Sequence, residues 1–97
     1  MQYGGSVYIM TNITHTVLYI GVTSNLIVRV RQHKEKTDPD CFTAKYNCCK
    51  LVYFENFNRI EEAISKEKRL KNWHREWKVN LFNQFNSSWK DLSGTLD

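Results

Sequence analysis

The architecture follows from the stretch Tyr19-Ile-Gly-Val-Thr-Ser-Asn-Leu-Ile-Val-Arg29-Val-Arg-Gln-His33, in which a β-rich run changes into a helical pattern. Residues 23–25 are Thr, Ser and Asn, which are preferred helix N-caps, and they stand directly before the apolar Leu26. We therefore expect a strand over residues 17–22, a tight turn, and a helix that continues to about Lys36.

Four polar side chains are expected to meet beside this turn. Tyr8 lies upstream in the similar run Ser6-Val-Tyr-Ile-Met-Thr, so Tyr8 and Tyr19 should come from adjacent strands. Arg29 and His33 are four residues apart and so share one face of the helix. Two phenols, a guanidinium and an imidazole at one corner are suited to grip a phosphate. The alternatives are core tyrosines with hydroxyls at the rim and a solvated arginine and histidine.

The rest of the pattern predicts an α+β fold, a small, mainly antiparallel three-stranded sheet flanked by helices. The expected elements are strands at 6–11, 17–22 and 50–55 and helices at 26–36, 59–73 and 76–85. Asn58 is the expected cap of the second helix, and residues 38–48 are expected to be irregular. Trp89 and Leu92 should dock the C-terminal segment onto the domain.

Length and composition limit the class of protein. With 97 residues and 41% hydrophobic content, the chain should form one domain over residues 1–97 with one modest core. Its apolar runs are too short to cross a bilayer and it opens without a signal segment, so we expect a soluble protein that is not exported. A net charge of +4 and a pI near 9.1 favour a polyanionic partner.

The three cysteines indicate a reducing compartment. Cys41, Cys48 and Cys49 are an odd number, and two neighbours in sequence are poor disulfide partners. We therefore expect a cytoplasmic protein. A zinc site from Cys41, Cys48 and a histidine lacks any supporting ligand spacing, so structural zinc is not expected.

Glu67 is the most unusual residue of the second predicted helix. The apolar positions Ile60, Ala63, Ile64 and Leu70 form a core-facing stripe at helical spacing, and Glu67 falls inside it. A carboxylate directed toward a core is unfavourable unless it is paired or bound to a metal. Glu67 is therefore either an edge residue paired with a lysine or with Arg29, or a metal ligand.

Five blocks in the same order resemble the GIY-YIG nuclease superfamily, especially its small stand-alone bacterial members. The blocks are Val7-Tyr8-Ile9; Tyr19-Ile20-Gly21; Leu26, Arg29 and His33; Leu51–Phe57 with Glu62–Trp73; and Asn86–Leu92. Two departures are visible. Ser6-Val7-Tyr8 replaces Gly-Ile-Tyr, and Asn86-Ser-Ser-Trp replaces Asn-Pro-x-Trp, which leaves Asn80 and Asn83 as alternatives for the late asparagine.

The resemblance implies a metal-dependent endonuclease with a catalytic set of Tyr8, Tyr19, Arg29, His33, Glu67 and Asn86. Glu67 would be the metal ligand for Mg²⁺ or Mn²⁺, which prefer oxygen donors and keep several waters. Tyr8 would accept the proton of the attacking water, which requires nearby positive charge from Arg29 and the cation to lower its pKa well below ~10. Arg29 would stabilise the charge that develops on the phosphoryl oxygens.

The other implied roles concern orientation and partners. Tyr19 and His33 would orient the phosphate and the attacking water, and Gly21 would allow a close backbone turn beside the site. The implied partner is nucleic acid, with DNA expected and little sequence preference, and no obligate protein partner is expected. Selectivity for DNA structure, the biological role in repair, mobile elements or restriction, and the oligomeric state stay open.

The sequence leaves two alternatives to the enzyme. A nucleic-acid-binding module of the same fold would keep the basic surface without cutting, and it would need no acidic ligand. A purely structural or protein-interaction domain would not explain why Tyr8, Tyr19, Arg29, His33 and Glu67 occur together.

Overall fold

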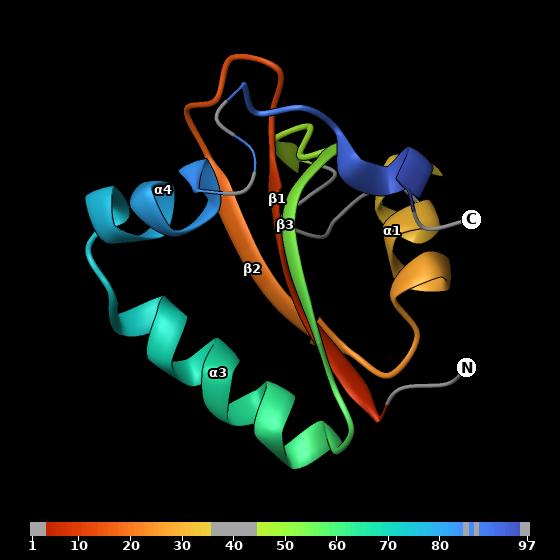
Figure 1. Cartoon of the computed structure of the whole chain (residues 1–97). Helices are drawn as coiled ribbons and strands as arrows, with labels where there is room; N and C mark the ends of the chain where they lie inside the picture. The colour runs from red at the N-terminus through yellow and green to blue at the C-terminus, as the bar shows by residue number, and fades with distance from the viewer. Residues whose placement is uncertain (1–3, 36–44, 85, 87, 96–97) are drawn as a thin grey trace.

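The chain forms a three-stranded sheet between two helical layers (Figure 1). The structure is a computed structural model that describes residues 4–35, 45–84, 86 and 88–95. The elements are β1 (Gly5–Thr11), β2 (Leu18–Thr23), α1 (Leu26–Glu35), β3 (Lys50–Phe57), α3 (Ile60–Asn72), α4 (Arg75–Asn83) and the 3-10 helix η1 (Leu92–Thr95). The predicted α+β class is confirmed. Lys36 and most of the segment expected to be irregular lie outside the described residues.

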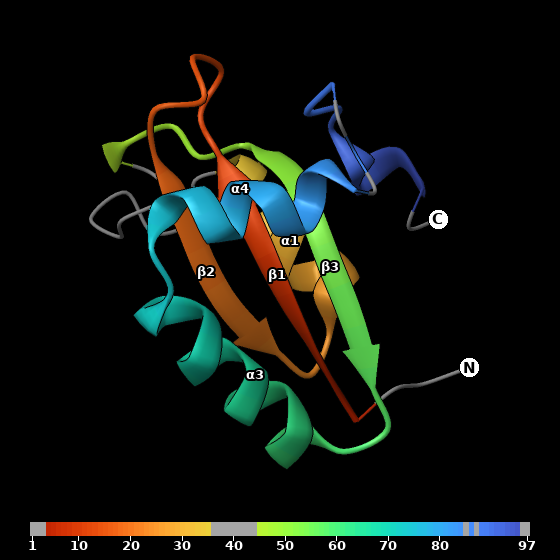
Figure 2. The same ribbon diagram turned by 60° about the vertical axis from the view of Figure 1, so that its left-hand side comes forward.

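The strands run antiparallel in the order β2-β1-β3, with β1 in the centre. Helix α1 lies on one face of the sheet, and α3 and α4 cover the other (Figures 1 and 2). Because β1 has a strand on each side and a helical layer above and below, all seven of its residues are buried. No helix within the described part of the chain is both long and apolar enough to span a membrane.

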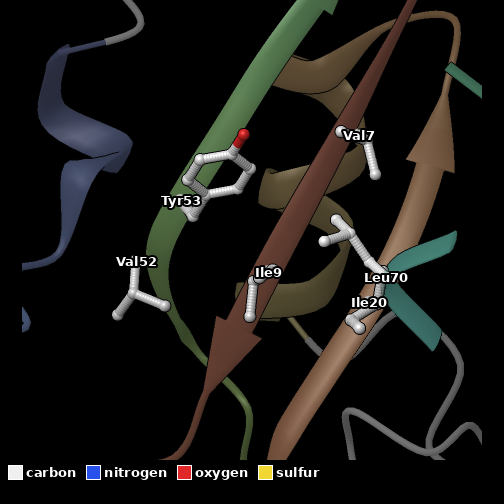
Figure 3. Packing of buried hydrophobic residues seen from close by; sticks show 6 residues of the cluster. All are labelled: Val7, Ile9, Ile20, Val52, Tyr53 and Leu70. Carbon is white, nitrogen blue, oxygen red and sulfur yellow. The ribbon is translucent and has the colours of Figure 1, made fainter. Parts of the chain in front are cut away.

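Alternating residues of β1 supply two separate cores, because successive side chains in a strand point to opposite faces. The cluster on the α3 side contains Val7, Ile9, Ile20, Val52, Tyr53 and Leu70 (Figure 3). The cluster on the α1 side contains Tyr8, Met10, Leu26, Val30, Cys48 and Leu51. A register shift between Ile9 and Met10 lets the consecutive residues Val52 and Tyr53 of β3 both join the first cluster.

The predicted cap of α1 is confirmed, whereas the predicted cap of α3 is wrong. The Asn25 side chain accepts a hydrogen bond from the Val28 N–H at 3.3 Å, and Asn25 is in turn held by the Thr23 hydroxyl at 3.1 Å. At α3 the N-cap is Arg59, not Asn58, and its side chain makes no capping bond. The first turn of α3 instead packs closely on β1, since a Cβ on Gly5 would lie 2.5 Å from the Ile60 side chain.

The apolar stripe of α3 is narrower than the sequence pattern suggests. Ala63 and Leu70 are fully buried against the sheet, but Ile64 is 36% exposed, so the expectation that it faces the core is wrong. The helix ends at Asn72, and Trp73 packs against the α3-side cluster. The stripe therefore follows the spacing of seven residues from Ala63 to Leu70, with Ile64 at its margin.

The C-terminal segment docks as predicted, and it contacts both cores. Trp89 packs against the α3-side cluster and Leu92 against the α1-side cluster. Asp91 fixes the segment between them. Its carboxylate accepts hydrogen bonds from Lys34 Nζ at 2.5 Å and from the Leu51 N–H at 3.2 Å.

Truncation of Leu70 should destabilise the domain far more than truncation of Ile64. Leu70→Ala removes a side chain with 0% exposure and should lower the free energy of unfolding by about 2 to 5 kcal/mol. Ile64→Ala should lower it by less than about 1.5 kcal/mol, because part of that side chain is already in water. Urea denaturation of both variants measures the difference, and equal losses would contradict the assigned core.

Candidate active site

Tyr8 and Tyr19 meet on the face of the sheet that α1 covers. Tyr8 stands opposite Gly21 in the β1–β2 register, and Tyr19 stands opposite Met10. The two tyrosines are thus two positions apart along the ladder and point to the same face. Their ring centroids lie 6.2 Å apart with the planes tilted by 46°.

Helix α1 brings His33 and Arg29 onto these phenols. Tyr8 Oη lies 2.8 Å from His33 Nε2, and the His33 ring centroid is 5.4 Å from that of Tyr19. The Arg29 guanidinium, one helical turn earlier, interacts with both tyrosine hydroxyls. The structure therefore brings together four of the six predicted site residues, in the arrangement that the spacing predicted.

One contact at this site was missed by the sequence analysis. Arg29 Nη1 donates a hydrogen bond to Gln32 Oε1 at 3.1 Å, which steadies the guanidinium beside the phenols. The signal was available, since residues three apart on a helix are neighbours.

The two buried rings of the site, those of Tyr8 and His33, are uncharged at neutral pH. Burial raises the pKa of Tyr8 above its usual value of 10, Tyr19 adds to the rise, and Arg29 offsets only part of it. Burial and the nearby Arg29 lower the pKa of His33 to about 4. Arg29 alone therefore does not lower the pKa of Tyr8 below its usual value, and the expected lowering by Arg29 together with a cation stays a prediction. At neutral pH a neutral phenol faces a neutral imidazole, and Tyr8 can donate to Nε2 when the other ring nitrogen carries the proton.

Gly21 makes room for the Tyr8 ring. A Cβ at this position would lie 2.5 Å from Cζ and Oη of Tyr8 and 3.0 Å from the Tyr19 ring. Gly21 is inside β2 and has no positive φ, so the expected role in a close turn is wrong. Only glycine fits at this position, because the Tyr8 side chain occupies the space that a Cβ would fill and its hydroxyl reaches His33 from there.

Glu67 lies on α3, in the layer on the other side of the sheet. Its side chain is 16% exposed, and its carboxylate pairs with Lys71 Nζ at 3.6 Å. On the opposite flank of the buried stripe, Lys66 Nζ is 3.9 Å from Glu55 on β3. Successive helical residues differ by roughly 100°, so Glu67 faces away from β3 and toward β2, the strand of Tyr19.

The donor set suits a hard divalent cation only in part. A mostly buried carboxylate is an oxygen ligand of the kind that Mg²⁺ and Mn²⁺ prefer, and the Lys71 side chain that pairs with Glu67 is exposed enough to move aside. In the described part of the chain no three His, Cys, Asp or Glu side chains form a group that could hold a metal. Glu67 therefore fits a cation that takes its other ligands from water and substrate. Cys48 and Cys49 are free thiols, and Cys41 lies outside the described residues.

Asn86 is not part of the four-residue cluster. Its buried amide donates to the carbonyls of Val52 at 3.3 Å and Lys90 at 2.7 Å, and accepts from the Lys90 N–H at 2.8 Å. These bonds place it beside β3, at the sheet edge opposite Tyr19. Of the alternatives, Asn80 is exposed, and Asn83 Oδ1 is buried without a hydrogen-bond partner among the described residues. The late asparagine of the site stays a prediction.

A known protein family matches most of the chain. The family model described as the GIY-YIG catalytic domain matches residues 4–80, which include the four clustered side chains and Glu67 but neither Asn83 nor Asn86. Neither a curated protein nor a solved structure shows a significant match to the chain.

Gly21→Ala should displace the Tyr8 ring. The added methyl would collide with the phenol at 2.5 Å, and overpacking of this kind destabilises by about 1 to 3 kcal/mol. Gly94→Ala is the matched control, because nothing lies within 4 Å of a Cβ there. The loss in unfolding free energy should shrink when Gly21→Ala is combined with Tyr8→Ala. An unchanged loss in the double variant would show that Tyr8 is not the obstacle.

His33 should make the domain less stable in mild acid. Its pKa falls from 6.5 in the unfolded chain to about 4 in the folded one, so the unfolded state takes up the proton first. Stability is therefore complete above about pH 6.5 and is lost as the pH falls toward 4, by up to about 3 kcal/mol. Unfolding free energies of His33→Gln should fall less steeply over this window, whereas the exposed His74→Gln should follow the parent protein. Parallel curves for all three proteins would refute the assignment.

Proposed function

Because this chain belongs to the GIY-YIG catalytic-domain family, we propose that it is a metal-dependent endonuclease that hydrolyses phosphodiester bonds in DNA. The family gives a nuclease-type function, and the convergence of Tyr8, Tyr19, Arg29 and His33 is the observation that carries the proposal. A net charge of +4 supports a nucleic acid as the substrate.

Arg29 is the proposed phosphate clamp. It interacts with both phenols, is braced by Gln32 and keeps its charge at every relevant pH. A fixed guanidinium stabilises negative charge that grows on the phosphoryl oxygens during hydrolysis, and it needs no reorganisation at that moment. The Tyr19 hydroxyl, on the neighbouring strand, would donate a further hydrogen bond to the same phosphate.

Tyr8 and His33 are proposed to act together as the general base. A phenol with a raised pKa is a poor acceptor by itself, but its oxygen is 2.8 Å from a neutral imidazole. As the attacking water gives its proton to Tyr8 Oη, the Tyr8 proton would pass to His33 Nε2. The phenol is thus neutral before and after the transfer, and the imidazole carries the charge.

Glu67 is the proposed metal ligand. When bound, Mg²⁺ or Mn²⁺ supplies Lewis-acid stabilisation of the phosphoryl and leaving oxygens. The cluster lies on the α1 side and Glu67 on the α3 side, and helical spacing directs Glu67 toward β2, the edge strand that carries Tyr19. A phosphate held by both would therefore lie along the outer edge of β2.

A non-catalytic nucleic-acid-binding module of this fold is the second candidate. Two observations favour it. The raised pKa of Tyr8 keeps the phenol protonated, and the pairing of Glu67 with Lys71 gives the carboxylate a partner within the protein, so neither group needs a metal or a reaction to explain it. The two candidates differ in whether metal produces cleavage.

Glu67→Gln should abolish metal-dependent cleavage. With Mg²⁺ or Mn²⁺ the parent protein should nick plasmid or branched DNA, and the variant should be at least about 100-fold slower, since it lacks the anionic ligand. Folding should persist, because a pair with an exposed lysine contributes only ~0–1 kcal/mol. Glu62→Gln, on the exposed face of α3, is the matched control and should cleave normally.

Two outcomes would decide against this assignment. Equal cleavage by the parent protein and Glu67→Gln would reject the metal role of Glu67. Binding without cleavage of duplex, nicked, flapped or branched DNA or of RNA by the parent protein would establish the binding module instead.

A further inference from the structure

The loop between β1 and β2 presents an isoleucine to solvent. Ile13 is 74% exposed, more than any other large hydrophobic residue in the described part of the chain. A single exposed apolar side chain is common on protein surfaces. This one is distinguished by the number of interactions that hold its loop in place.

Asn12 braces the loop from within. Its Oδ1 accepts hydrogen bonds from the N–H groups of Thr16 at 2.9 Å and Val17 at 3.1 Å. Its Nδ2 donates to the hydroxyls of Thr14 at 3.1 Å and Thr16 at 2.7 Å. Residues 12–17 are therefore ordered before any ligand arrives, so that little conformational entropy is lost on binding.

Three other parts of the fold brace the loop from outside. Arg75, at the start of α4, donates to the carbonyls of His15 at 2.6 Å and Thr16 at 3.3 Å. The His15 ring stacks on Trp89 at 4.4 Å, and its Nε2 lies 2.9 Å from Lys50 Nζ. These contacts hold His15 at φ 59°, a conformation that side-chain-bearing residues seldom adopt. Ile13 thus stands on a rigid tip.

The charge around this tip suits a polyanion. The first acidic residue of the chain is Glu35, so the whole β1–β2 hairpin and nearly all of α1 carry no negative side chain. Arg75 and Lys50 stand at the base of the loop, with Glu76 as the neighbouring acid on α4. The hairpin itself therefore presents no carboxylate to a phosphate backbone, and the acids that flank it belong to other elements, namely Glu55 on β3, Glu67 on α3 and Glu76 on α4.

We propose that Ile13 is an apolar wedge that inserts at an opened base step of DNA held on the Tyr8 cluster. The proposal rests on the proposed function. Ile13 is five residues from Tyr8, beyond the end of β1 at Thr11, so at ~3.3 Å per strand residue the two lie at most roughly 16 Å apart. That span corresponds to at most about five base steps at ~3.4 Å each. Apolar side chains inserted between bases must unstack them, at a free energy of a few kcal/mol in intact duplex.

The wedge specifies a substrate class. Where the stack is already broken, most of the unstacking energy is not needed, so a rigid wedge favours DNA with a nick, a flap or a junction over continuous duplex. The tip supplies this selectivity through shape alone, since isoleucine makes no hydrogen bond to a base edge.

A fluorescent base tests the wedge without any cleavage. In EDTA, nicked duplexes carrying 2-aminopurine at successive positions should show increased fluorescence at one step when the parent protein binds. Ile13→Ala should lose this increase, and its preference for nicked over intact duplex should fall several-fold. The salt dependence of binding should not change, because no charge is removed. Ile13→Leu should keep the increase, as should the control Ile64→Ala on α3.

The outcomes separate this inference from the nuclease proposal. No increase with the parent protein at any position, or an unchanged increase with Ile13→Ala, overturns the wedge, and cleavage in Mg²⁺ would still support the nuclease. An increase that depends on Ile13 without cleavage in Mg²⁺ supports the wedge on a binding module. Because Ile13 is exposed, Ile13→Ala should change the unfolding free energy by at most ~0.5 kcal/mol, so lost folding does not explain a lost signal.

Discussion

The hydrogen bond between Tyr8 and His33 joins the central strand to α1, and the candidate site depends on that connection. It closes over Gly21, where only the absence of a side chain leaves room for the phenol. The same burial that positions the two rings keeps both neutral, because a low-dielectric environment disfavours their charged forms. Geometry and protonation therefore have a single physical origin here, the packing of α1 on the sheet.

The sequence was most informative where spacing determines geometry. Two positions on adjacent strands and a four-residue interval on a helix have fixed consequences, so the meeting of Tyr8, Tyr19, Arg29 and His33 was predictable. The N-cap at Asn25 and the docking of the C-terminal segment were predictable for the same local reasons.

Other features depend on contacts that no pattern encodes. Burial outweighs Arg29 in setting the pKa of Tyr8, and burial is a property of the assembled layers that residue spacing does not encode. Gly21 was expected from the resemblance to let the backbone turn beside the site, whereas its role is steric and involves a residue on another strand. Ile64 matched the apolar period of α3, but only Ala63 and Leu70 are fully buried, and the Ile64 side chain stays partly exposed. Whether Glu67 holds a cation is likewise a question of approach from another layer, which helical spacing alone does not settle.

The C-terminal segment has one more consequence, which concerns self-association. An edge strand offers unpaired backbone groups that can pair with a strand of another molecule. Along β3, Asn86 takes the carbonyl of Val52 and Asp91 takes the N–H of Leu51. Amide and carboxylate side chains therefore pair with this part of the β3 edge in place of a fourth strand. Loss of the segment would leave these backbone groups unpaired and open to intermolecular β-pairing.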